Sequence, residues 1–214
     1  PQPAEDFLLS WPDNGFGRIT TLPTQQEGYR HGIYVHAGFW LNHLVQDPYP
    51  LLLAQEMKRA LLAHKADQYC LVNGQTVRHF LLNLEMCSAV CFDPAQLDAE
   101  NFYLAWATRY VGQAAAPNLI SIYSLLHKAQ DERKGYVELL WDVQVAQKRI
   151  QQGGGGEEAE WAEEKLVHTK RRIAQLKMAQ HLAEQTVPLV IDQASFFHDQ
   201  VILPVTLLLQ LNQF

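Results

Sequence analysis

The sequence predicts an α/β fold in its first part and a helical bundle in its second part. The stretch from Asp67 to Pro94 places a short apolar run, an Asn-Gly turn and a longer apolar segment in that order. That order is typical of a buried strand followed by a loop and a helix. After Pro94 the apolar residues recur at helical spacing. We therefore expect one domain over residues 1–116 and a helical domain over 117–214.

Three strands are expected in the α/β part. Short apolar or β-rich runs, bounded by Pro, Asn and Gly, predict strands at Asp6–Trp11, Gly32–Phe39 and Asp67–Asn73. Between the last two, Leu51–His64 contains helix formers throughout and carries an apolar stripe on one face. This strand–helix–strand spacing favours parallel pairing through a right-handed crossover.

The rest of the chain is expected to be helical. Four glycines, Gly153–Gly156, would each cost about 1 kcal/mol inside a helix, so they predict a turn or a flexible tether, natural or engineered. Pro204 should kink the last helix. One helix is predicted to begin near Phe80 and the last to begin near Asp192. Between them, helices are predicted at Asp98–Val111, Pro117–Gln130, Tyr136–Gln151 and Glu157–Glu184.

Composition narrows the classes of function. The net charge of -6, without a basic block, argues against a nucleic-acid partner. The apolar run Leu189–Leu211 is interrupted by charged residues and a proline, so no membrane span is expected. Cys70, Cys87 and Cys91 are too few for a disulfide framework. Cys87 and Cys91 are four residues apart without a paired His motif, so we expect buried small side chains and no metal site.

Three parallel strands raise a physical problem. They leave two open sheet edges and provide too little surface for a barrel, which needs about eight strands. The remaining strands are therefore expected in another chain or in a longer form of this one. The start at Pro1, without an initiator Met, fits a processed chain, a fragment or an engineered piece.

The loop after Asp67–Asn73 is the first place to look for chemistry. In α/β barrels and doubly wound sheets, ligands bind at the loops that leave the carboxyl ends of the strands. Asn73, Gln75, Thr76 and Arg78 occupy that loop. A polar connection without a function is an equally open interpretation of the same residues.

Five segments, taken together, carry a resemblance to a known family. They are WPDNGFGRITTLP, GIYVHAGFW, LVNGQTVRHFLLNLE, CFDP and SFFHDQVILPVTLLLQLN. In this order and spacing they resemble family 115 glycoside hydrolases, the xylan α-glucuronidases. The resemblance implies that residues 1–116 are the C-terminal part of a TIM-like (β/α) barrel and that a helical bundle follows it. The chain would be a fragment or a divergent member of that family.

The resemblance also implies positions for the site. The family's tryptophan-aspartate turn corresponds to Trp11, Asp13 and Asn14. Its tyrosine-histidine strand corresponds to Tyr34 and His36, and the loop beyond that strand holds Trp40.

Two further positions come from the third strand and the helix after it. The asparagine of the family's third-strand motif corresponds to Asn73, and a glutamate in the following helix corresponds to Glu85. The sequence departs from the motif at Gln75 and Thr76, which replace a glycine and an aspartate, and at Arg78, which replaces a lysine.

The implied reaction is the hydrolytic release of glucuronic or 4-O-methylglucuronic acid from xylan, by inversion and without a cofactor. Such enzymes need two carboxyl groups about 6.5–9.5 Å apart. Asp13 and Glu85 are the expected catalytic pair, although Asp13 could instead cap its own turn and Glu85 could form an ion pair. With Thr76 in place of the aspartate, that loop has no acid to protonate a leaving group.

The expected substrate contacts fit a uronic acid. His36 could donate a hydrogen bond to the uronate carboxylate, and Arg78 could pair with it bidentately. Trp11 and Trp40 could stack on sugar rings, although packing is the commoner role of tryptophan. A satisfied core or rim histidine is an equally open interpretation of His36. The other expected binding residues are Asn14, Tyr34, Asn73 and Gln75.

Two other classes of function remain open. The chain could be a non-catalytic carbohydrate-binding or scaffold protein that kept the fold and lost the acids. It could also be a helical interaction module in which Glu157–Phe214 is the functional part. The expected partners are glucuronoxylan or a uronic-acid oligosaccharide, and a second copy of the chain or the remaining barrel segment. The resemblance implies an extracellular or periplasmic location.

Overall fold

The computed structural model describes residues 7–24, 29–38, 48–75, 77–129, 144–149, 151 and 156–213. The chain divides into two compact units, Pro1–Trp106 and Ala107–Phe214, and each is described by itself. The elements of the first unit, and the helix that continues into the second, are β1 (Leu8–Pro12), β2 (Arg30–His36), α1 (Pro50–Lys58), η1 (Arg59–Ala63), β3 (Cys70–Asn73), η2 (Val77–His79), α2 (Leu81–Phe92) and α3 (Ala99–Val111). Those that follow are α4 (Ala116–Ala129), α6 (Gly156–Thr186), η3 (Val187–Leu189), α7 (Ala194–Phe197), η4 (His198–Ile202) and α8 (Leu203–Gln213).

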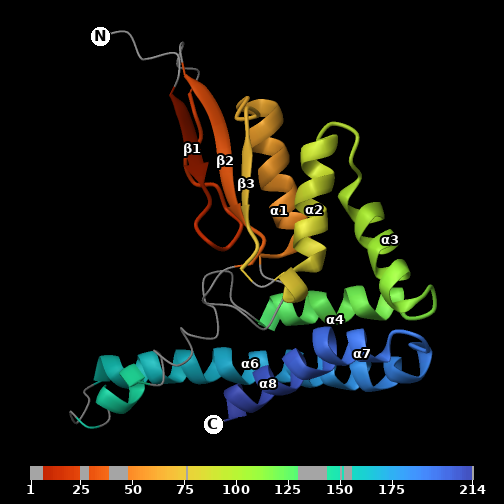
Figure 1. Ribbon diagram of the computed structural model, residues 1–214. Coiled ribbons are helices and arrows are strands. Elements are labelled where there is room, and N and C mark those ends of the chain that lie inside the picture. The colour runs from red at the N-terminus through yellow and green to blue at the C-terminus, as the bar shows by residue number, and fades with distance from the viewer. Residues whose placement is uncertain are drawn as a thin grey trace. The chain divides into compact units, whose positions relative to one another are not determined.

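The strands of the first unit form a parallel sheet in the order β1-β2-β3 (Figure 1). Pro12 of β1 lies opposite Tyr34 of β2, and His36 of β2 lies opposite Asn73 of β3. Because the strands are parallel, their carboxyl ends meet at one edge of the sheet. The three predicted strands are thus confirmed, and so is their parallel pairing.

One face of the sheet packs against helices. Ile33 and Val35 of β2 are 0% exposed, while the intervening Tyr34 is half-buried and the neighbouring Leu71 is 53% exposed. Side chains alternate between the two faces of a strand, so Ile33 and Val35 point to the core and Tyr34 points away from it. The core is completed by α1 and α2, whose fully buried side chains include Leu53, Met57, Leu82 and Met86.

Close packing explains one glycine within β2 and one just after it. A Cβ atom on Gly32 would collide with the ring of Tyr69, and one on Gly38 would collide with the ring of Phe80. The strand can therefore approach the segment before β3 and the start of α2 only where no side chain is present.

The predicted helices are also present, with some corrections. The helix expected at Leu51–His64 is α1 followed by the π-helical turn η1. Gly156 is already the first residue of α6, so the expectation that it belongs to a turn is wrong, and residues 153–155 lie outside the described residues. Of the helix predicted at Tyr136–Gln151, the structure describes 144–149 and 151, which are helical.

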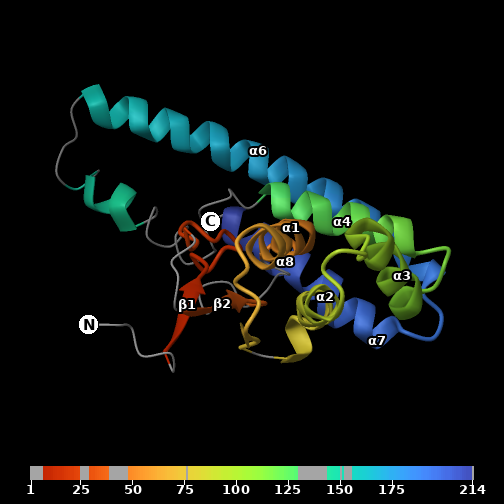
Figure 2. The same ribbon diagram turned by 90° about the horizontal axis from the view of Figure 1, so that it is seen from above.

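The second unit is helical, and α6 packs along α4 and α8 (Figure 2). Asn118 Nδ2 donates to Thr186 Oγ1 at 3.1 Å and so joins the start of α4 to the end of α6. Arg172 Nε donates to the carbonyl of Ala129 at 2.8 Å. The apolar side chains buried in this unit include Leu119, Ile122, Leu126, Leu176, Ala179, Phe197, Val201, Val205 and Leu208.

Within the described residues, the segment Ala194–Gln213 is long and apolar enough to cross a membrane by length and composition alone. It comprises α7, η4 and α8, and α8 packs against α6 with Val205 and Leu208 buried. This packing is typical of the core helix of a globular unit. The helix changes from η4 to α8 just before Pro204, where the sequence predicts a kink.

Side chains from the helices hold the loops at the carboxyl edge of the sheet. Glu56 Oε2 of α1 accepts a hydrogen bond from the backbone N–H of Ile19, in the loop after β1, at 3.2 Å. Asn83 of α2 is fully buried, and its Nδ2 donates to the carbonyls of Ala37 and Pro48, both at 2.8 Å. One side chain therefore ties the end of β2 to the start of α1.

We expect Asn83→Ala to lower the free energy of unfolding by about 2–4 kcal/mol, because it leaves two buried carbonyls without their donor. Asn83→Asp should cost at least as much, since a carboxylate would face two carbonyl oxygens. Urea unfolding followed by circular dichroism measures both. Ser88→Ala, at an exposed position of the same helix, is the control and should change little. An Asn83→Ala variant as stable as the control would contradict this role.

Candidate functional site

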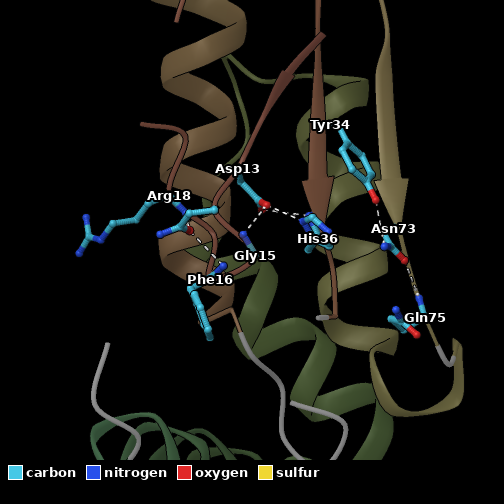
Figure 3. A network of polar contacts seen from close by, with 9 residues as sticks. Asp13, Gly15, Phe16, Arg18, Tyr34, His36, Asn73 and Gln75 are labelled. Atoms are coloured by element: carbon cyan, nitrogen blue, oxygen red, sulfur yellow. Dashed lines mark hydrogen bonds and ion pairs between the residues drawn. The ribbon is translucent and has the colours of Figure 1, made fainter. Parts of the chain in front are cut away.

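The carboxyl edge of the sheet gathers polar side chains from all three strands (Figure 3). Asp13 follows β1, Tyr34 and His36 end β2, and Asn73 ends β3. The sequence predicts each of these four positions separately, and the parallel register brings them to one edge. They form two hydrogen-bonded groups.

The first group joins Asp13 to the end of β2. The carboxylate of Asp13 is 0% exposed and accepts three hydrogen bonds. Oδ1 accepts from the N–H of Gly15 at 2.9 Å and from Nδ1 of His36 at 2.5 Å, and Oδ2 accepts from the N–H of His36 at 3.0 Å. The N–H of Asp13 in turn donates to the carbonyl of Tyr34 at 2.9 Å. The carboxylate thus fixes both the backbone and the ring of His36.

The second group joins β2 to β3. Asn73 Nδ2 donates to the hydroxyl of Tyr34 at 3.0 Å, and Asn73 Oδ1 accepts from the N–H of Gln75 at 3.1 Å. The rings of Tyr34 and His36 lie 4.8 Å apart between centroids. Gln75 is exposed and has a φ of 45°, a left-handed conformation that is uncommon for residues other than glycine. The asparagine side chain supports this conformation through its bond to the Gln75 backbone.

Asn14 shapes the loop after β1. Its Oδ1 accepts from the N–H of Phe16 at 3.0 Å and from the N–H of Arg18 at 3.1 Å. Gly15 and Gly17 have φ values of 84° and 82°, which favour glycine. Asn14 is exposed, so its amide nitrogen lies at the surface beside the Asp13 group.

Trp11 lies apart from these groups. Its Nε1 donates to His31 Nδ1 at 3.1 Å, near the amino end of β2. In the sheet register, Trp11 is paired with Ile33, and the side chain of Ile33 points into the core. Tyr34 and His36 alternate with Ile33 along β2, so their side chains point to the other face. The structure therefore does not bring Trp11 together with His36 and Asn73.

The other predicted site residues are not part of these two hydrogen-bonded groups. Glu85 is half-buried on α2, and it is not among the hydrogen-bond partners of Asp13. Arg78 lies in η2, directly after the loop that leaves β3, and is exposed. Trp40 and Thr76 lie outside the described residues. In the part of the chain that the structure describes, no group of three His, Cys, Asp or Glu side chains is placed to hold a metal ion.

The arrangement allows specific chemistry at His36. Because Nδ1 is hydrogen-bonded to Asp13, any chemistry at His36 would use Nε2. The His36 side chain is 12% exposed. The sequence predicts both residues but not their contact. The signal for that contact is an Asp and a His at the ends of neighbouring parallel strands.

Similarity to known proteins establishes the family of this chain. The sequence profile of Glycosyl hydrolase family 115 matches residues 1–137. The chain belongs to glycosyl hydrolase family 115. The resemblance inferred from the five sequence segments is therefore confirmed. No curated protein matches the sequence.

A solved family 115 structure is similar to the whole chain. It is described as a family GH115 4-O-methyl-α-glucuronidase, BtGH115A, with specificity for decorated arabinogalactans. The TM-score is 0.63 at 19% sequence identity, over 99% of this chain and 28% of that chain. At this identity the similarity shows the fold, a small parallel sheet with many helices. The chain spans less than a third of the length of that family 115 protein.

We expect Asp13→Asn to lower the free energy of unfolding by about 1–3 kcal/mol, because an amide cannot accept all three hydrogen bonds. The variant should also move the His36 proton from Nδ1 toward Nε2, which the ¹⁵N chemical shifts of the ring report. Asp67→Asn, at an exposed position, is the control. Unchanged stability and unchanged His36 shifts would show that the carboxylate does not orient the ring.

Proposed function

We propose that this family 115 chain forms part of a site that binds glucuronic acid, or its 4-O-methyl ether, on a plant polysaccharide such as xylan. The single observation that carries the proposal is the placement of His36, held by the buried Asp13, beside Tyr34 and Asn73. This cluster offers hydrogen-bond donors for a uronate carboxylate. It lies at the carboxyl edge of a parallel sheet, where α/β folds bind ligands.

We also propose how the two parts of the chain fit the architecture of a larger enzyme. Residues 1–116 would be the C-terminal part of a TIM-like barrel, and 117–214 the helical domain that follows. Two observations support this. Within the described residues, β1 and β3 each pair with one strand only. The sheet face that carries Tyr34 and Leu71 is turned away from the buried core, as the inner face of a barrel would be.

Several residues around the cluster would complete the substrate contacts. The exposed Arg78 would pair with the carboxylate, and Asn14 and Gln75 would bond to sugar hydroxyls. Trp40 would stack on a sugar ring. Trp11 is better assigned to packing, since it is bonded to His31.

Catalysis would require two carboxyl groups that face the bond to be cleaved. The family resemblance assigns Asp13 and Glu85 to this pair. The burial of the Asp13 carboxylate supports an indirect role, in which it sets the orientation of the His36 ring. Glu85 would then need a carboxylic acid from another part of the barrel.

The same burial favours a second candidate function, in which this chain binds the sugar without cleaving it. A carboxylate that accepts three hydrogen bonds and has no exposed surface cannot reach a glycosidic oxygen. Thr76 stands where the family motif has an aspartate, and a threonine cannot protonate a leaving group, which also favours binding without cleavage. Hydrolysis and binding must therefore be measured separately.

We expect the chain to bind methyl α-D-glucuronoside more tightly than methyl α-D-glucoside, because only the former has a carboxylate. His36→Ala and Asn73→Ala should each weaken the uronoside about tenfold, and the neutral sugar less. Calorimetric titration measures both ligands, and Ser88→Ala is the control.

Release of uronic acid from glucuronoxylan, measured in parallel, separates the two candidates. Release that is lost in Glu85→Gln supports hydrolysis, and binding without release supports the non-catalytic role. Equal affinity for both sugars, or His36→Ala binding like the control, would contradict the proposed site.

A further inference from the structure

The hydrogen bond between Asn73 and Tyr34 has a direction that the neighbouring contacts determine (Figure 3). The Oδ1 atom of Asn73 accepts from the backbone N–H of Gln75 at 3.1 Å. Because a backbone N–H can only donate, the oxygen of the Asn73 amide must lie on that side and the nitrogen on the other. The Nδ2 atom therefore donates to the hydroxyl oxygen of Tyr34, at 3.0 Å.

This direction leaves the hydroxyl hydrogen of Tyr34 available. A tyrosine hydroxyl can accept through its oxygen and donate its own hydrogen at the same time. Asn73 uses the oxygen, and within the part of the chain that the structure describes no acceptor takes the hydrogen. Tyr34 is half-buried on the sheet face that also carries the exposed Leu71. A ligand on that face can therefore accept the hydrogen.

We propose that the Tyr34 hydroxyl donates a hydrogen bond to the uronate carboxylate, and that Asn73 is a positioning residue that acts through Tyr34. This inference rests on the proposed function and assigns recognition of the carboxylate to one atom of that site. A hydroxyl that accepts a hydrogen bond is polarised and donates a stronger one. A negatively charged carboxylate gains more from such a donor than a neutral sugar hydroxyl does.

The contacts around Tyr34 fix the donor before a ligand arrives. Its ring lies 4.8 Å from the ring of His36, between centroids, and Asp13 orients that second ring. The carbonyl of Tyr34 accepts from the N–H of Asp13 at 2.9 Å. Backbone, ring and hydroxyl are thus each in contact with a neighbour, which lowers the entropy cost of ordering the side chain on binding.

The first measurement needs no ligand. In NMR spectra of the free chain, the side-chain amide protons of Asn73 should move upfield in Tyr34→Phe, because their acceptor is lost. The backbone N–H of Gln75 should change little, since its bond to Asn73 remains. Tyr69→Phe, just before β3, removes a hydroxyl from the other end of that strand and is the control. Unchanged Asn73 shifts would overturn the proposal.

The second measurement is calorimetric titration of the full chain with methyl α-D-glucuronoside and methyl α-D-glucoside. Tyr34→Phe should weaken the uronoside about tenfold or more, and the neutral glucoside by less than about threefold. Tyr69→Phe should bind both sugars like the original chain.

A double-variant cycle separates positioning from direct contact. Asn73→Asp keeps the acceptor for Gln75 but turns the hydroxyl hydrogen of Tyr34 toward the new carboxylate, so the uronoside should bind at least about tenfold more weakly. The same substitution in Tyr34→Phe should cost several-fold less, because only the repulsion between two carboxylates remains.

The inference and the proposed function fail in different ways. An original chain that does not prefer the uronoside contradicts the proposed function, and this inference with it. A preference that Tyr34→Phe leaves intact overturns the role of Tyr34 alone. An equal cost of Asn73→Asp with and without the Tyr34 hydroxyl would show that Asn73 contacts the ligand itself, which overturns its positioning role.

Discussion

The attachment of Asp13 to the end of β2 is the constraint on which the site depends. Parallel pairing brings the strand ends to one edge, but it does not determine where a histidine ring points. The carboxylate does so through a bond to the His36 backbone and a second bond to its ring. A negative charge with no exposed surface is stable there only because its acceptor positions are filled. Stable burial of the charge and the orientation of the histidine ring therefore depend on the same hydrogen bonds.

Most of the fold was predictable from local patterns. Short β-rich runs bounded by Gly and Pro predict the three strands, and apolar periodicity predicts α3, α4 and α6, because these signals are carried by neighbouring residues. The π-helical turn η1 and the helical state of Gly156 were not predictable in the same way. Tertiary packing decides both, and propensity alone disfavours the second.

The candidate site was predictable as a set of positions but not as a network. The end of the third strand identifies Asn73 because ligand sites of parallel sheets lie there, and the family resemblance identifies Asp13 and His36. Their pairing depends on register, which a single sequence does not encode locally. Trp11 illustrates the difference: its position next to Asp13 suggests a sugar contact, but alternation along β1 directs it to His31. Asn83 and Glu56 carry no motif, so the loops they hold were not assigned to them.

The anchoring by Asn83 has a consequence for how such a protein can evolve. Its amide fixes the backbone on both sides of the connection between β2 and α1, so one side chain of α2 holds the strand end and the helix start in place. Insertions or exchanges between the two anchors would be tolerated with little loss of stability.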